Sequence, residues 1–493
     1  MTEPGAETAY LFRHALVRAG AYELQLPQDR AALHALAVDV LEELLDSETL
    51  DSAALELADH AHAAAQLEGK AERYLQAEAR FLGRAHAHSR RRYAHGNVIG
   101  TGRRLLEHPY GVAETRSELA RTVGFAHMHQ GEMQDAINSF QQAAVHALSD
   151  EQRGRALMAE ADIYRNMTRF TEAEKLFREA LECLPEGHAD HAVVLRQLAT
   201  LYLMQGQVPQ GEELMRQALQ ASLAAGDTSS AARCEANLGV VMMRTGRPAE
   251  AEQAFVRAGE LAEKAGDRTT VALANENLGA LLAQTGRMQD FETCFQLAME
   301  QARQLGDRPL LASILTDRGH ALTEAERFSE AETAMRDAIE LHRETRNLGK
   351  LATTLGNLGV LYFRTGRKAE ALRLTRESLA MHQASGDAGA ECVGRLNLSD
   401  TLFEDGDFEE ALRELERAAL LAEQVRDPRL QGYTVCHRVM TLARRDNVAP
   451  DQAEWRRGIE FIRQSGDLAA IGRLEAELRE RFPGTPDRDG QGD

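Results

Sequence analysis

Four asparagines recur at intervals of 40 residues or a multiple of 40, and their amides could bind a polypeptide backbone. They are Asn237, Asn277, Asn357 and Asn397, and Asp317 holds the remaining place in the series. An asparagine amide accepts a hydrogen bond from a peptide N–H and donates one to a peptide C=O. A row of such amides would hold the main chain of an extended or helical segment. The alternative is that each amide bonds to a neighbouring helix of its own chain.

Other residue types that could do chemistry lack the required spacing. Histidines occur as His-x-His pairs, such as His127 with His129. On a helix the two rings of such a pair point about 200° apart, which is a poor arrangement for holding a metal ion. The chain contains no Gly-x-x-x-x-Gly-Lys-Ser/Thr phosphate loop and no Gly-x-Ser-x-Gly motif. We therefore expect no catalytic residue, no metal site and no cofactor, and an enzyme is the least favoured class.

The composition narrows the class of partner and the compartment. The 493 residues carry 77 acidic and 57 basic side chains, a formal net charge of −20 that would repel the phosphates of a nucleic acid. No run approaches the ~20 apolar residues of a membrane span. The chain opens on an acidic stretch without an apolar run, and its five cysteines include no Cys-x-x-Cys pair. These features predict a cytoplasmic protein with reduced thiols that binds neither nucleic acid nor membrane.

The elements that position the asparagines are predicted to be paired helices. A second series with the same 40-residue step places Gly-Asp or a related pair at 226, 266, 306, 346, 386, 426 and 466. Apolar residues recur at helical spacing from Thr269 to Thr285, Gly286 breaks this helix, and a second helix ends at Gly306. Asp307 is placed to cap the next helix. One supersecondary unit is therefore copied along the chain, which predicts an all-α solenoid without strands. The helix pairs are expected to turn at Gly131, Thr168, Gly206, Gly246, Gly286, Glu326, Gly366 and Gly406.

This unit resembles the tetratricopeptide repeat. That family places a Leu-Gly pair and a large residue in the first helix, glycine at the turn, and Ala, an aromatic residue and Ala in the second helix. The unit at 232–266 carries this pattern as Leu238, Gly239, Met242, Gly246, Ala251, Phe255 and Ala258. The pattern repeats in about eight units over residues 112–426. The resemblance implies a right-handed superhelix of about eight to ten helix pairs.

The 40-residue step exceeds the usual 34 residues of this family and is similar to the repeats of kinesin light chains, which grip extended peptides. At the family position of the four asparagines, side chains face a concave groove. For Met243, Phe363 and Phe403 the pattern leaves two alternatives open, an apolar pocket for a ligand or the core between repeats. The resemblance implies a partner-binding groove formed by Asn237, Asn277, Asp317, Asn357, Asn397, Met243, Arg244, Phe363, Arg364 and Phe403.

Residues 10–34, which include Phe12 and His14, resemble the segment that closes the winged-helix region in bacterial signalling ATPases of the STAND type. In those proteins the segment joins the ATPase to a tetratricopeptide sensor array, and residues 55–106 continue the resemblance. Because the chain has no phosphate loop, the resemblance implies the sensor half and not the ATPase. We expect an N-terminal helical segment at 1–50, irregular helical repeats at 51–111, the regular array at 112–465, a capping helix at 466–482 and a disordered tail at 483–493.

Two functions fit these features. The first is a non-enzymatic scaffold or regulatory adaptor that binds a peptide segment or partner protein in the groove, in bacterial signalling or defence. The alternative is a sensor array that binds a small effector or a signalling peptide and changes shape to control a partner ATPase, kinase or protease. An open groove lined by the asparagines favours the adaptor, whereas a closed pocket with convergent charges favours the sensor.

Overall fold

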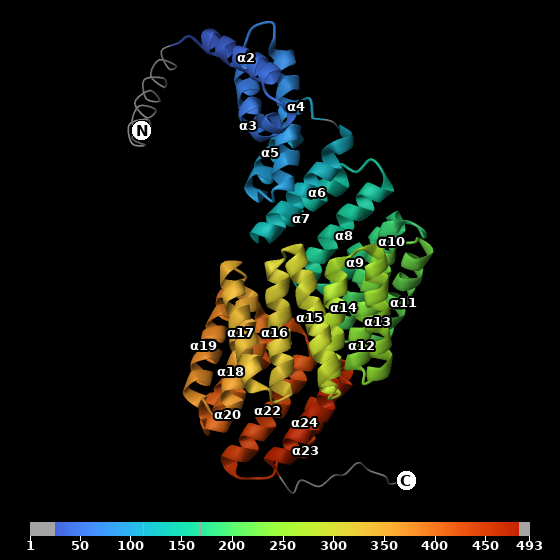
Figure 1. Cartoon of the computed structure of the whole chain (residues 1–493), viewed down its shortest axis with the longest axis vertical. Coiled ribbons are helices and arrows are strands. Elements are labelled where there is room, and N and C mark those ends of the chain that lie inside the picture. The colour runs from blue at the N-terminus through green and yellow to red at the C-terminus, as the bar shows by residue number, and fades with distance from the viewer. Residues whose placement is uncertain (1–24, 112, 168, 483–493) are drawn as a thin grey trace. The chain divides into compact units, whose positions relative to one another are not determined.

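The computed structural model describes residues 25–111, 113–167 and 169–482 as α-helices joined by short turns (Figure 1). No strand occurs in these ranges, so the prediction of an all-α solenoid is confirmed. The chain divides into two compact units, Met1–Leu184 and Pro185–Asp493. The predicted tail and most of the segment that resembles STAND ATPases lie outside the described residues. Among the described helices, none has the length and apolar character that a membrane span needs.

In the first unit each helix packs against the next one along the chain. Its helices are α2 (Pro27–Leu44), α3 (Ser47–Ala64), α4 (Ala71–Arg91), α5 (His95–Glu107), α6 (Ala113–Gln130), α7 (Met133–Val145), α8 (Asp150–Asn166) and α9 (Phe170–Cys183).

The second unit repeats a hairpin of two helices. The first helices of its pairs are α10 (Ala189–Met204), α12 (Thr228–Arg244), α14 (Arg268–Gln284), α16 (Arg308–Glu324), α18 (Leu348–Arg364), α20 (Ala388–Asp405) and α22 (Pro428–Asp446). Their partners are α11 (Val208–Ala224), α13 (Pro248–Ala265), α15 (Met288–Leu305), α17 (Phe328–Glu344), α19 (Lys368–Ser385), α21 (Phe408–Val425) and α23 (Gln452–Gln464), and α24 (Leu468–Arg481) follows within the stretch predicted to form a capping helix. First helices of successive pairs also contact one another, from α10 with α12 to α20 with α22.

The predicted turn residues adopt the left-handed conformation that ends a helix. All six glycines among the predicted turn residues have positive φ. Glu326, which stands in the glycine position of its repeat, also has a positive φ of 59°. Thr168, the remaining predicted turn, lies outside the described residues. The second turn of each repeat is closed by the predicted caps, since the carboxylate of Asp307 accepts a hydrogen bond of 2.9 Å from the backbone N–H of Leu310. The repeat boundaries are therefore set by local residue chemistry.

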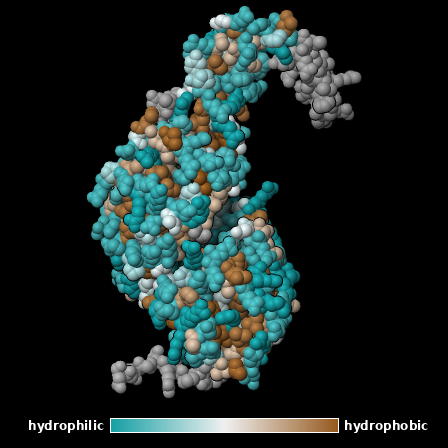
Figure 2. All heavy atoms as spheres, turned by 180° about the vertical axis from the view of Figure 1, so that it is seen from behind, coloured by the Kyte–Doolittle hydropathy of each residue, from teal (hydrophilic) through white to brown (hydrophobic). Residues whose placement is uncertain are grey.

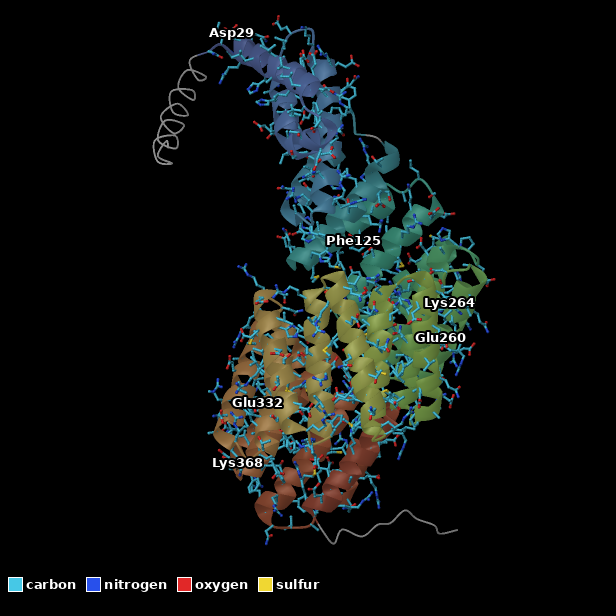
Figure 3. All side chains as sticks on the ribbon, viewed as in Figure 1. Asp29, Phe125, Glu260, Lys264, Glu332 and Lys368 are labelled. Atoms are coloured by element: carbon cyan, nitrogen blue, oxygen red, sulfur yellow. The ribbon has the colours of Figure 1, made fainter. Side chains whose placement is uncertain are left out.

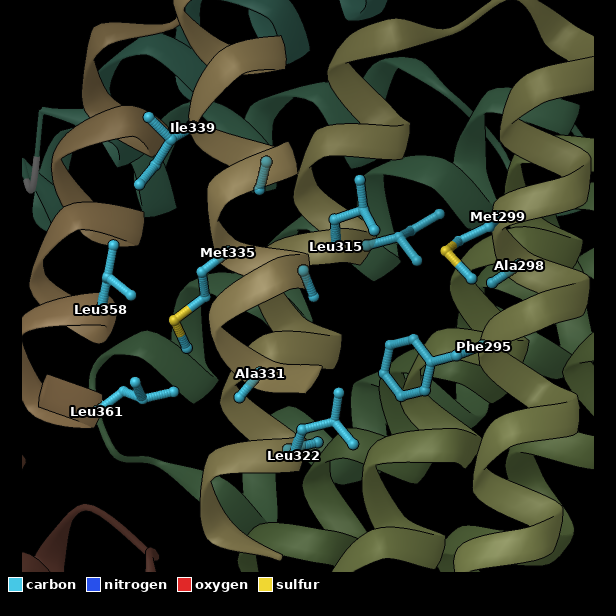
Figure 4. Close-up of a cluster of buried hydrophobic side chains, with 14 of the residues drawn as sticks. Phe295, Ala298, Met299, Leu315, Leu322, Ala331, Met335, Ile339, Leu358 and Leu361 are labelled. Carbon is cyan, nitrogen blue, oxygen red and sulfur yellow. The ribbon is translucent and has the colours of Figure 1, made fainter. Parts of the chain in front are cut away.

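Small residues in the first helices make room for large ones in the second. A Cβ on Gly239 would lie 2.5 Å from the ring of Phe255, and a Cβ on Gly279 would lie 2.7 Å from the ring of Phe295. Successive pairs then share one core, in which Phe295 of α15, Leu322 of α16, Met335 of α17 and further side chains of α18 are buried (Figure 4). Each hairpin thus buries its apolar face on its neighbours, as expected of a solenoid.

The face seen in Figure 2 is mostly hydrophilic, with small hydrophobic areas. Ion pairs connect successive hairpins of the second unit. Glu332 of α17, which is labelled in Figure 3, accepts from Arg367 at 3.2 Å, and Lys368 lies 3.6 Å from Asp405. Such exposed pairs each contribute little to stability, typically below about 1 kcal/mol.

Candidate functional site

The asparagine series lies on one partly exposed face of the first helices. Asn237, Asn277, Asn357 and Asn397 are half-buried, and Asp317 is exposed. Because each residue belongs to a first helix and those helices contact one another, the five side chains form a row that crosses α12, α14, α16, α18 and α20. We call this surface, with the exposed residues one helical turn on either side of the row, the ladder face.

The four asparagine amides have no hydrogen-bond partner among the described residues. A neighbouring asparagine shows the contrast, because Asn275 donates from Nδ2 to the carbonyl oxygen of Val271 at 2.9 Å. The amide nitrogen of Asn397 lies 3.8 Å from the point that a Cβ on Gly356 would occupy, so it rests against α18 without a polar contact there. The amides therefore keep their donors and acceptors available.

Exposed apolar side chains flank this row. Val240, Leu273 and Val393 are 37%, 39% and 41% exposed, and each lies three or four residues from an asparagine of the series. Residues with that spacing share one face of a helix. The ladder face therefore combines partly exposed amides with exposed apolar side chains. The sequence reasoning missed these residues, although Leu273 and Val393 both lie four residues before an asparagine of the series.

Two carboxyl groups meet in the middle of the ladder face. Glu276 is 7% exposed, and its burial together with a hydrogen bond to Asp317 raises its pKa well above the ordinary value. The ammonium of Lys350 opposes this shift. Glu276 is thus held in its protonated form over much of the neutral range, and it serves as a donor toward Asp317.

Two first helices of the second unit contact its C-terminal stretch. Arg244 of α12 donates to the carbonyl oxygen of Ser465 at 3.2 Å, and Asp400 of α20 lies 2.7 Å from Arg481 of α24. Asp400 lies one helical turn from Asn397 and Arg244 lies at the C-terminal end of α12, and both side chains reach the same C-terminal stretch. Arg481 of α24 also contacts Glu404 of α20 at 3.1 Å.

Several residues expected in the groove have other surroundings. Phe403 is 6% exposed and packs in the core that contains Trp455, so its assignment to the groove is wrong and the alternative of an inter-repeat core residue holds. Phe363 is half-buried against the shared core, and Met243 is half-buried. Arg364 pairs with Glu324 at 2.8 Å. The sequence alone did not separate these positions, because groove and core residues recur with the same period.

Models of the tetratricopeptide repeat match residues 124–188, 190–264, 270–344, 351–385 and 393–417. No curated protein matches the chain. Solved structures with a similar fold include a Rap protein complexed with competence and sporulation factor (14% identity, TM-score 0.49, 67% of this chain and 92% of that one). Another is a STAND protein with a tetratricopeptide repeat sensor from Pyrococcus horikoshii (16% identity, TM-score 0.46, 74% of this chain and 54% of that one). A third is BtubC from P. vanneervenii (18% identity, TM-score 0.38, 46% of this chain and 92% of that one).

The repeat models together span most of the described second unit and reach back into the first, and the helix pairs, turns and glycine–aromatic contacts described above fit them. The chain belongs to the tetratricopeptide repeat family.

Proposed function

We propose that the protein is a non-enzymatic adaptor that binds an extended or helical peptide segment of a partner protein along the ladder face, within bacterial signalling or defence in the cytoplasm. The observation that carries the proposal is the row of asparagine amides without intramolecular partners. A half-buried amide that makes no hydrogen bond is costly unless water or a ligand satisfies it. Membership of a family that commonly presents interaction surfaces supports the same proposal.

The flanking side chains suggest how such a segment would be held. Amides of Asn277, Asn357 and Asn397 would pair with its peptide groups, and Val240, Leu273 and Val393 would cover its apolar side chains.

The test begins with the full chain as bait for a random peptide library, and the best peptide is then measured by fluorescence anisotropy. Each lost neutral hydrogen bond weakens binding by about 0.5–1.5 kcal/mol. Replacing Asn277 and Asn357 together by Ala should therefore weaken binding by roughly tenfold or more. Asn275→Ala is the matched control, because the Asn275 amide is already bonded to Val271. Equal affinities of the double variant and the control would refute the assignment.

A sensor array is the second candidate function. It is favoured by the contact between Arg244 and Ser465, since a ligand that opened this contact would change the curvature of the second unit. Small-angle scattering with and without the selected peptide separates the two functions. A constant scattering profile supports the adaptor, and a reproducible change in the radius of gyration supports the sensor.

A further inference from the structure

The second helix of most hairpins begins with an ion pair between an arginine and an acid three residues later. In each case the arginine is the residue that precedes the helix. The charged atoms lie 2.5 to 3.7 Å apart. The five pairs are Arg169–Glu172, Arg247–Glu250, Arg287–Asp290, Arg327–Glu330 and Arg367–Glu370.

The hairpin of α6 and α7 breaks this rule in two ways. The residue before α7 is Glu132, so the usual arginine is replaced by a second acid three residues before Asp135. Five residues before Glu132 stands His127, where the other five hairpins have Tyr164, Met242, Leu282, Leu322 and Tyr362. Compared with the other five hairpins, this turn lacks the arginine and has an additional carboxylate and an imidazole.

These three side chains meet at one point. His127 is 5% exposed, and its Nδ1 lies 2.6 Å from Oε2 of Glu132. One ligand atom each from His127, Glu132 and Asp135 falls within 4.8 Å of the others. Both carboxylates are exposed and sit at the first turn of α7, where the helix dipole favours their ionised form.

We propose that His127, Glu132 and Asp135 bind a divalent transition-metal ion, with Zn²⁺ as the best fit, in the place of the missing arginine. One imidazole nitrogen and two carboxylate oxygens form a ligand set typical of Zn²⁺. Tetrahedral ligands at the usual zinc distances lie about 3.4 Å apart, so Glu132 has to move outward slightly, which its exposed side chain permits. On binding, the metal would occupy the place between the imidazole and the carboxylate that their hydrogen bond holds in this structure.

The surroundings leave the fourth coordination position accessible. A cavity of about 390 Å³ has His127 and Asp135 in its wall, together with Asn138, Gln142 and His146. The same cavity is lined by Arg103 and Glu107, so its charges are mixed. A water molecule or a small anionic ligand fits as the fourth donor. The sequence analysis predicted no metal site in the chain, because it considered His-x-His pairs such as His127 with His129, whereas the partners of His127 here come from the following turn.

Another hairpin shows that two acids alone do not make such a site. Asp407 and Glu410 have the same spacing before and within α21, and Leu402 stands in the position of the histidine. There the carboxylate of Asp407 caps the helix by accepting from the N–H of Glu410, and Glu410 pairs with Arg376 at 3.0 Å. Both acids are satisfied within the protein. The buried imidazole is what distinguishes the turn between α6 and α7.

The experiment is calorimetric titration of the chelator-treated full chain with zinc chloride at pH 7.5. Glu132→Arg restores the arginine–acid pair of the other hairpins, so it should fold normally and bind one equivalent of zinc less than the parent. His127→Gln should weaken the affinity for that zinc ion by at least the 10–100-fold seen when groups supporting a metal site are lost.

Arg287→Glu is the matched control, because it creates two acids before α15 with Leu282 in the histidine position. No gain of zinc in this variant, together with the loss in Glu132→Arg, supports the site. Equal zinc binding by the parent and Glu132→Arg would overturn the proposal and leave His127 as a simple ion-pair partner of Glu132. A gain in Arg287→Glu would overturn the role of the histidine.

Discussion

Arg244 and Ser465 are joined by a hydrogen bond of 3.2 Å across 221 residues of sequence. The guanidinium at the end of α12 donates to the main-chain carbonyl oxygen just before α24, and α12 also contacts α24 directly. Nearby, a Cβ on Gly206 would come within 2.8 Å of the carbonyl oxygen of Gln464. The first hairpins of the second unit therefore meet its last ones, and this contact limits how far the unit can open.

Arg244→Ala should loosen the C-terminal stretch without unfolding the repeats. A hydrogen bond from a charged donor contributes about 1.5–3 kcal/mol, and in a solenoid most contacts are between neighbours and survive its loss. Hydrogen exchange followed by mass spectrometry should show faster exchange in 465–481 and unchanged exchange in α14 to α17. Arg364→Ala, which removes an exposed pair with Glu324, is the control. If residues 465–481 exchanged at the same rate in the wild type, Arg244→Ala and Arg364→Ala, the contact of Arg244 with Ser465 would not hold α12 to the C-terminal stretch.

Two glycines inside helices should respond in opposite directions to the same substitution. A Cβ on Gly279 would lie 2.7 Å from the fully buried ring of Phe295, so Gly279→Ala should destabilise by about 1–3 kcal/mol through overpacking. Around Gly259 of α13 no atom lies within 4 Å of that point, so Gly259→Ala should stabilise by up to about 1 kcal/mol through helix propensity. Urea denaturation measures both. Stabilisation by both changes would contradict the close-packing role of Gly279.

The sequence determined the hairpins because their signals are local. Gly246 and Gly286 end helices by their own conformational freedom, and Asp307 caps the helix that follows it, so each feature depends on a few neighbouring residues. The contact of Arg244 with Ser465 has no such signal, since nothing in a repeat pattern records which distant hairpins meet.

The candidate site was partly visible for the same reason. A period of 40 residues identifies equivalent positions, but it does not reveal whether a position faces solvent or a neighbouring helix. The half-exposed amide of Asn357 and the buried ring of Phe403 both belong to periodic series, and only packing separates them. The sequence reasoning did not bring His127 together with Glu132 and Asp135, because these acids lie across a turn. It compared His127 only with His129 of the same helix.

Glu276→Gln should stabilise the protein at neutral and alkaline pH. Burial and the hydrogen bond to Asp317 raise the pKa of Glu276, so the folded state binds this proton more tightly than the unfolded state does. Wild-type stability therefore falls as the pH rises from the ordinary pKa of glutamate toward the raised one. The glutamine keeps a donor for Asp317 and has no proton to lose.

The gain should be on the order of 1 kcal/mol or more near pH 8 and should shrink as the pH is lowered toward 6. Thermal unfolding of both proteins across this range measures it, with the exposed Glu263→Gln as control. A gain that is equal at every pH would show that ionisation of Glu276 is not its source.

The contact between α2 and α3 should weaken in acid, because two imidazoles face each other there. Nδ1 of His34 lies 2.6 Å from Nδ1 of His60, and one proton between them can satisfy both nitrogens. Burial, followed by the proximity of His60, lowers the pKa of His34. The unfolded state then binds more protons than the folded one between the lowered pKa and about 6.5, so stability rises with pH in that window and is lost on acidification.

Positive charges on both rings would repel each other across this short contact. The protection of amides in 27–64 against hydrogen exchange, relative to the intrinsic rate at each pH, should therefore fall between pH 7 and pH 5.5 in the wild type, and less so in His34→Gln, which carries no proton-binding ring. The exposed His320→Gln should behave as the wild type does. An equal loss of protection in His34→Gln, which lacks the facing pair of rings, would assign the effect to other groups of the first unit.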